Sequence, residues 1–226
     1  SGFNTFDSDS YNVHLDDPGE PNLFRDIFPY DEVPKIGFNH RLSPMRVPPE
    51  IWITDTSFRD GQQSIPPYSA KQVVDLYKML HRLGGPKGLI RQAEFFLYTK
   101  KDQEAISKVQ ELGYEYPEIT GWIRAHKKDL TLAKELGMKE TGILTSASDY
   151  HIFLKLRKTR KEVMNDYLWI VREAIEVGII PRCHFEDATR ADFYGFVVPF
   201  AHELMKLAEE SKSVIKIRVC DTLGLG

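Results

Sequence analysis

From residue 50 onward, short apolar and β-branched runs alternate with longer amphipathic segments. Six runs have the length of one strand each: "EIWITD", "LIRQAEFFL", "EITGWIRA", "ETGILTSA", "IIPRCHFEDA" and "VIKIRVCDT". The first segment between them has apolar residues at helical spacing, namely Val73, Leu76, Tyr77, Leu80 and Leu83. Ser69 and Gln72 form a capping box at its start. The alternation predicts a series of βα units.

The predicted helices share one stop signal, an apolar residue followed by glycine. It occurs as "RLG" at Gly84, "ELG" at Gly113 and Gly137, and "EVG" at Gly178. Glycine after the last helical turn can adopt positive φ and so end the helix. We therefore expect four helices to end at these four glycines.

Strands that are joined by helices run parallel, and the helices cover either both faces of an open sheet or the outside of a closed barrel. A doubly wound sheet for a dinucleotide usually carries GxGxxG after its first strand, where this chain reads "SFRDGQQS". The pattern favours a (β/α)8 TIM barrel. Because such a barrel needs eight strands and about 250 residues, we expect residues 50–226 to be the N-terminal part of a catalytic barrel domain in a longer gene product.

Residues 1–49 have a different composition. "DSDSYNVHLDDPGEPN" is polar with turn signals, and prolines interrupt the aromatic residues of "FRDIFPYDEVPKIGF". We expect an irregular, extended N-terminal arm that packs on the barrel or on a neighbouring subunit.

Composition excludes several classes of protein. The net charge of −3 and pI near 6.2 give no basic surface for nucleic acid. Cys183 and Cys220 are too far apart for a CxxC motif and form no disulfide framework, which suits a reducing, cytoplasmic location. No signal peptide is visible, and no run approaches the roughly 18 apolar residues that a membrane span requires.

Polar residues gather at the ends of the predicted strands, where TIM barrels carry their active sites. They are Asp55, Arg59, Asp60, Glu94, Arg124, Ser146, Ser148, Asp149, His151, His184, Glu186, Asp187, Arg190, Asp221 and Thr222. So many ionisable groups on one rim exceed what a purely structural barrel needs.

Each residue also has an ordinary structural explanation. Asp60 with Gly61 is by itself typical of a turn. Glu94 lies in an apolar strand and needs a cationic partner, for which we choose Arg59. His184 is expected to be a core or supporting histidine. His151 suits a helix start and a substrate contact equally, and Asp149 is a candidate N-cap.

Four segments together resemble one family. "DTSFRDGQQS" resembles the D-T-x-R-D-G-x-Q signature of the DRE-TIM metallolyases, "SASDYHIFLKLRKTRKEV" their fourth-strand segment, "HFEDATRAD" the E-D-x-x-R-[ST]-D segment of their synthases, and "RVCDTLGLG" their sixth-strand D-T-x-G. The family includes 2-isopropylmalate, homocitrate and citramalate synthases, Re-type citrate synthase and hydroxymethylglutaryl-CoA lyase. The resemblance covers residues 50–226 with the segments in the family's order.

The resemblance implies roles for individual residues. Asp60 would bind a divalent metal ion, and Arg59 would stabilise the developing enolate oxygen. Glu94 would hold Arg59, while Glu186 and Thr222 would line the 2-oxo-acid site. A hard divalent cation is chelated by the carbonyl and carboxylate oxygens of a 2-oxo acid, and a permanently charged arginine suits charge stabilisation rather than proton transfer.

Three further residues are grouped with the substrate contacts. They are Gln63, an amide that follows Asp60; His151; and Arg124, which either meets a second substrate carboxylate or forms a structural ion pair.

Two features depart from the family's pattern. The family's remaining metal ligands form an H-x-H pair on strand seven, and no such pair occurs in this sequence, so we expect it beyond residue 226. The second strand reads "AEFFLYTKKD" in place of E-x-G-x-P, which indicates a divergent branch. The metal can be Mg²⁺, Mn²⁺, Co²⁺ or Zn²⁺, and no general base can be named.

The leading hypothesis is an acyltransferase that condenses an acyl-CoA, chiefly acetyl-CoA, with a 2-oxo acid, releases CoA and forms a hydroxy di- or tricarboxylic acid. Re-type citrate synthase and isopropylmalate synthase are both candidates. The alternatives are a hydroxyacyl-CoA lyase with the same metal and arginine, and an inert barrel fragment. We expect a homodimer, since family members commonly dimerise and the aromatic arm suits contact with another subunit.

Overall fold

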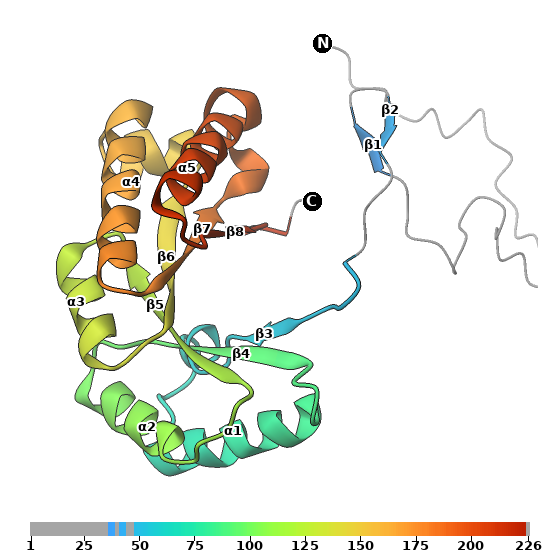
Figure 1. The fold of residues 1–226 in the computed structure, drawn as a ribbon, viewed down its shortest axis with the longest axis vertical. Helices are drawn as coiled ribbons and strands as arrows, with labels where there is room; N and C mark the ends of the chain where they lie inside the picture. The colour runs from blue at the N-terminus through green and yellow to red at the C-terminus, as the bar shows by residue number, and fades with distance from the viewer. Residues whose placement is uncertain (1–35, 39–40, 44–47, 225–226) are drawn as a thin grey trace, which may run out of the picture. The chain divides into compact units, whose positions relative to one another are not determined.

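Six parallel strands with helices on their outer face form half of a TIM barrel (Figure 1). The computed structural model describes residues 36–38, 41–43 and 48–224. The strands are β3 (Ile53–Asp55), β4 (Ile90–Phe95), β5 (Glu118–Arg124), β6 (Glu140–Ser146), β7 (Ile180–Glu186) and β8 (Lys216–Val219). Each strand pairs with the next one in the sequence, in the order β3-β4-β5-β6-β7-β8. The six predicted strands are therefore confirmed.

The helices follow the strands in turn. They are α1 (Ala70–Gly84), α2 (Lys100–Gln110), α3 (Lys127–Glu135), α4 (Arg160–Glu176) and α5 (Val198–Ser211). The predicted capping box of α1 is present, with the Ser69 hydroxyl accepting from the Gln72 N–H. Of its apolar stripe, Val73 and Tyr77 are buried, whereas Leu83 is 76% exposed. None of the helices in this described part is long and apolar enough to cross a membrane.

One predicted helix stop is wrong. Gly113, Gly137 and Gly178 have the expected positive φ, between 63° and 80°, but in α1 the positive φ of 65° belongs to Gly85 and the helix includes Gly84. A Cβ on Gly84 would lie 3.1 Å from the backbone nitrogen of Ile90. Gly84 is thus needed for close packing against the start of β4, and the next glycine turns the chain.

Alternation along the strands separates two environments. Apolar side chains face the helices and form the core, among them Ala93, Phe95, Ile123, Ile143 and Phe185. The other face of the sheet carries a buried polar set, Gln92, Glu94, Thr120, Glu140, Arg182 and His184. The inside of the half-barrel is therefore polar and charged.

The N-terminal region is a separate part of the structure, which divides between Glu50 and Ile51. In it, β1 (Ile36–Phe38) pairs antiparallel with β2 (Arg41–Ser43), a hairpin that the proline-interrupted pattern did not predict. The rest of the arm predicted for residues 1–49 lies mostly outside the described residues. Its proposed contact with a neighbouring subunit stays a prediction.

Candidate active site

The carboxyl ends of the strands surround a cavity of about 570 Å³. Five of the six strands, all but β4, contribute lining residues. These residues lie in the strand itself or in the segment that follows it. The lining residues are Thr56, Arg59, Asp60, Gln63, Trp122, Leu144, His184, Glu186, Arg218, Cys220 and Thr222. Five of these, Arg59, Asp60, Gln63, Glu186 and Thr222, are residues that the sequence placed at the site.

Arg59 is held firmly at the edge of this cavity. Phe58, which is 1% exposed, stacks on Phe95 of β4 with ring centroids 4.7 Å apart and so anchors the segment after β3. The Arg59 guanidinium donates from Nε to Glu94 Oε2 at 3.0 Å and from Nη1 to Asp60 Oδ1 at 2.7 Å. It also lies 4.6 Å from the centre of the Trp122 ring. The predicted Arg59–Glu94 pair is confirmed.

Glu94 is fully buried and is shared by three arginines. Besides Arg59, its carboxylate accepts hydrogen bonds from Arg182 of β7 and from Arg218 of β8, the latter at 2.9 Å. A buried carboxylate is stable only when cations and donors compensate its lost hydration. Glu94 therefore fixes three guanidinium groups from three different parts of the chain.

A second buried carboxylate, Glu140, extends this network along the inner face of the sheet. Glu140 of β6 pairs with Arg182 and with Lys216. Arg182 also donates to the amide oxygen of Gln92. The inner face thus carries one continuous network of charges beneath the cavity.

His184 lies between the network and the cavity as a neutral ring. Its Nε2 accepts from Arg182 Nε at 3.1 Å, which leaves the ring proton on Nδ1. Burial, and then the nearby charges of Arg182, Arg218 and Arg59, lower the pKa of His184 to about 2. The expectation of a supporting histidine agrees with these contacts, and the side chain also lines the cavity.

Glu186, at the end of β7, also lines the cavity. The Ser146 hydroxyl donates to its Oε2, and His151 Nδ1 lies 2.9 Å from the same oxygen. Lys155 Nζ lies 3.4 Å away. His151 therefore contacts Glu186, which lines the cavity, but does not line the cavity itself.

Thr222 and Asp187 are joined at the rim. The Thr222 hydroxyl oxygen accepts from the Asp187 N–H at 2.8 Å, so its own proton is available to a ligand. Asp187 has a φ of 61°, and its carboxylate accepts from Ser148 and Arg190. Those hydrogen bonds, led by the one from Arg190, lower the pKa of Asp187.

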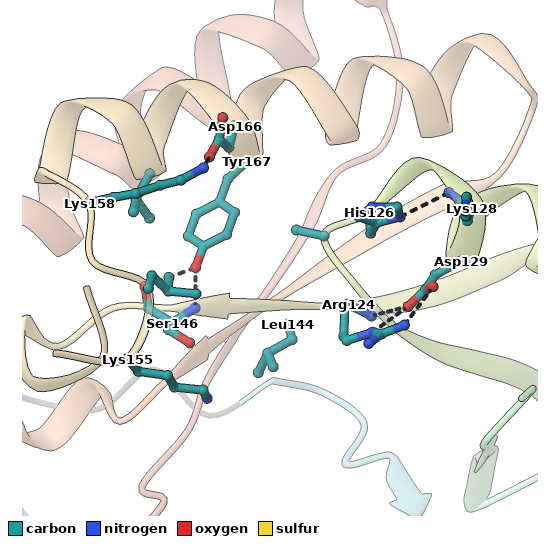
Figure 2. Close-up of a pocket in the computed structure, with 13 residues that line it drawn as sticks. Arg124, His126, Lys128, Asp129, Leu144, Ser146, Lys155, Lys158, Asp166 and Tyr167 are labelled. Atoms are coloured by element: carbon teal, nitrogen blue, oxygen red, sulfur yellow. Dashed lines mark hydrogen bonds and ion pairs between the residues drawn. The ribbon is translucent and has the colours of Figure 1, made fainter. Parts of the chain in front are cut away.

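Two rim residues have structural partners. Arg124 lines a neighbouring cavity of about 390 Å³ and grips Asp129 with Nε at 2.8 Å and Nη2 at 3.0 Å (Figure 2). This contact favours the ion-pair explanation over a substrate contact. Asp149 does not use its side chain as an N-cap, because its carboxylate instead pairs with Arg160, which also binds Asp192.

Sequence reasoning missed Arg182, Arg218 and Trp122. A local signal existed for the two arginines, since each interrupts an apolar strand, in "IIPRC" and "IKIRV", as Glu94 does. Trp122 gave no signal, because an aromatic residue in a strand is ordinary core material.

The described residues do not complete a metal site. Asp60 presents one carboxylate to the cavity, but no three His, Cys, Asp or Glu side chains come together in this part of the chain in a way that could hold a metal ion. A hard divalent cation needs more ligands than one carboxylate. Of the described residues, Asp60 would therefore supply one ligand, and the others would have to come from elsewhere.

Comparisons with known proteins agree with this geometry. The chain is 61% identical to a "Citrate (Re)-synthase" of Syntrophus aciditrophicus over 216 residues, which are 96% of this chain and 34% of that protein. It is 59% identical to a "Citrate (Re)-synthase" of Clostridium kluyveri over 96% of this chain and 48% of that protein. The chain thus spans between a third and a half of the length of these curated relatives.

Solved structures support the fold. The hydroxymethylglutaryl-CoA lyase of Bacillus subtilis superimposes with a TM-score of 0.60 at 16% identity, covering 80% of this chain and 61% of that one. At this identity the likeness concerns the fold alone. Residues 50–226, the part that holds all six strands, match the HMGL-like family. The chain therefore belongs to the HMGL-like, or DRE-TIM metallolyase, family, as its motifs indicated.

Proposed function

We propose that the protein containing this chain condenses acetyl-CoA with a 2-oxo acid. The observation that carries the proposal is the Arg59–Glu94 pair, which fixes a permanent positive charge at the edge of a polar cavity. In the condensation, the acetyl methyl group loses a proton, and the resulting enolate carbon bonds to the carbonyl carbon of the 2-oxo acid. The carbonyl oxygen becomes a hydroxyl group, and water then cleaves the thioester to release CoA and a carboxylate.

Arg59 has the chemistry to stabilise the negative charge that develops on oxygen. Its two hydrogen bonds, to Glu94 and Asp60, hold the guanidinium in one orientation before the substrate arrives. Glu94 acts as a positioning residue because it is fully buried, does not line the cavity, and holds Arg59, which does. The Thr222 hydroxyl and Gln63 amide supply donors for the carboxylate of the 2-oxo acid.

The names of the two synthase relatives support citrate as the product. Citrate arises when the 2-oxo acid is oxaloacetate, so the second substrate would be a 2-oxo dicarboxylic acid. A divalent metal, with Asp60 as one ligand, belongs to the same proposal and would polarise the substrate carbonyl. A homodimer and a cytoplasmic location also remain predictions.

The test uses the full-length protein with Mn²⁺ and measures CoA release from acetyl-CoA in the presence of oxaloacetate, 2-oxoglutarate, 2-oxoisovalerate, pyruvate or glyoxylate. We expect release with oxaloacetate, its loss in EDTA, and a decrease of at least 100-fold in kcat for Arg59→Ala. Arg172→Ala, which changes an exposed arginine of α4, is the matched control and should retain full activity.

The other outcomes separate the alternatives. No CoA release with any acid, combined with cleavage of a hydroxyacyl-CoA, would assign the lyase reaction instead. No activity in either direction would leave an inert barrel. Release with a branched or monocarboxylic acid alone would preserve the condensation and refute the citrate assignment.

A further inference from the structure

The charged network beneath the cavity has more positive than negative charge. Its cations are Arg59, Arg182, Arg218 and Lys216, and its buried anions are Glu94 and Glu140. Adding Asp60, which pairs with Arg59 at 2.7 Å and is about half exposed, gives three carboxylates for four cations. His184 adds no charge. Among the described residues, these four cations therefore share direct ion pairs with three carboxylates.

Within the described part of the chain, Arg218 is the cation of this network with the weakest ionic compensation. Arg59 pairs with Asp60 and Glu94, Arg182 with Glu94 and Glu140, and Lys216 with Glu140. Arg218 pairs with Glu94, which also pairs with Arg59 and Arg182. The other hydrogen bond of Arg218 goes to the neutral Thr54 hydroxyl at 3.0 Å. Burial and the charge of Arg182 lower the pKa of Arg218, as expected for a cation in an unfavourable environment.

Arg218 also has access to a ligand. Its side chain lines the cavity, whereas that of Arg182 is 3% exposed and lies beneath it. Its hydrogen bonds to Glu94 and Thr54 use Nη1 and Nη2, and a guanidinium has five N–H donors. The side chain can therefore donate hydrogen bonds to a second anion while it keeps its hydrogen bond to Glu94.

The position along β8 places Arg218 below the rim. Arg218 lies within β8, Cys220 and Thr222 follow the end of the strand, and all three line the cavity. A 2-oxo acid whose carbonyl end meets Arg59, Asp60 and Thr222 would direct its other end inward, toward Arg218. An uncharged alkyl group there would leave the guanidinium unpaired, whereas a carboxylate would compensate it.

We propose that Arg218 determines the substrate specificity of this site by binding the second carboxylate of a 2-oxo dicarboxylic acid. The inference rests on the proposed condensation, because it concerns the acid that the same cavity accepts. The matching class of substrate is a short 2-oxo acid with a carboxylate at the end remote from its carbonyl group. Acids with an aliphatic end are disfavoured at the same position.

The test measures binding of oxaloacetate and of pyruvate to the full-length protein by calorimetry with Mn²⁺ and without acetyl-CoA. These acids share the 2-oxo-carboxylate end and differ in the second carboxylate. In Arg218→Met we expect oxaloacetate to bind about 10- to 100-fold more weakly, the loss expected for a charged hydrogen bond, and pyruvate to bind within about twofold of wild type. Arg172→Met is the control and should bind both acids as the wild type does.

Equal weakening for both acids would overturn the proposal, because it would mean that Arg218 acts only through Glu94 and Arg59. Unchanged oxaloacetate binding would overturn it as well. Should Arg218→Met not fold, Arg218→Lys decides, since a retained charge should keep part of the preference for oxaloacetate. Absence of CoA release in the wild type would refute the condensation alone, because the two binding constants decide the role of Arg218 separately.

Discussion

Replacing Glu94 with glutamine tests whether the buried charge network holds the inside of the barrel together. Glutamine keeps the size of the side chain but removes the charge. Glu94 is fully buried and accepts from Arg59 at 3.0 Å, from Arg218 at 2.9 Å and from Arg182. In Glu94→Gln, Glu140 would still pair with Arg182 and Lys216, and Asp60 with Arg59, but Arg218 would lose its ion pair with Glu94.

Removing one partner of a buried ion pair typically costs about 3–5 kcal/mol of stability. We expect the free energy of unfolding to fall by about that amount. With a urea dependence of about 3 kcal/mol per molar, the unfolding midpoint decreases by roughly 1–1.7 M. Urea titration of the full-length protein, followed by tryptophan fluorescence, measures this change. The matched control is Glu104→Gln, which alters an exposed carboxylate paired with Lys108 and should leave the midpoint unchanged.

A double variant makes the test more specific. Adding Arg218→Met to Glu94→Gln removes one surplus cation and should recover part of the lost stability, with a coupling of about 1 kcal/mol or more. A midpoint in Glu94→Gln that differs from wild type by less than the equivalent of about 1 kcal/mol would refute the charge argument. Additive effects in the double variant would also contradict it.

Two further predictions concern the same inner face. His184 has a pKa of about 2 when folded and about 6.5 when unfolded, so its stabilisation is complete above pH 6.5 and is lost as the pH falls from 6.5 toward 2. As the pH falls from 7.5 to 5.0, this effect should lower the free energy of unfolding by about 2 kcal/mol. His184→Gln should remove that part of the pH dependence, and parallel pH profiles for the variant and the wild type would contradict the prediction. Gly142→Ala should lower stability by about 1–3 kcal/mol in the same urea assay, because its Cβ would lie 2.7 Å from Trp122. Gly61→Ala, with its nearest contact at 3.6 Å, is the control, and an equal loss in both would refute the packing argument.

The sequence predicted those parts of the fold and site that depend on local patterns. Each strand was recognisable in the sequence as an apolar run, and the strands follow the same order in the sheet as along the chain. The Arg59–Glu94 pair was predictable because a carboxylate in an apolar strand requires a cation and few were near the expected rim.

The remainder depended on distances in space that no local pattern records. Arg182 and Arg218 meet Glu94 from positions 88 and 124 residues away. Arg124 was ambiguous for the opposite reason, since its partner Asp129 is only five residues away and both explanations fitted the sequence. The one-residue error at Gly84 arose because the contact with Ile90 was invisible.

The sequential order of the sheet has a consequence for folding during synthesis. Every strand from β4 to β8 pairs with the strand made just before it, so no strand has to wait for a distant partner. Each new βα unit can add to the edge of those already formed as the chain leaves the ribosome. Loop closure is then limited to one helix at a time, which keeps the entropic cost of each step small. The charge network is the exception, because Glu94 gains its last guanidinium only when β8 arrives. The charge network around Glu94 is therefore assembled only after β8, the last of these six strands, has been added.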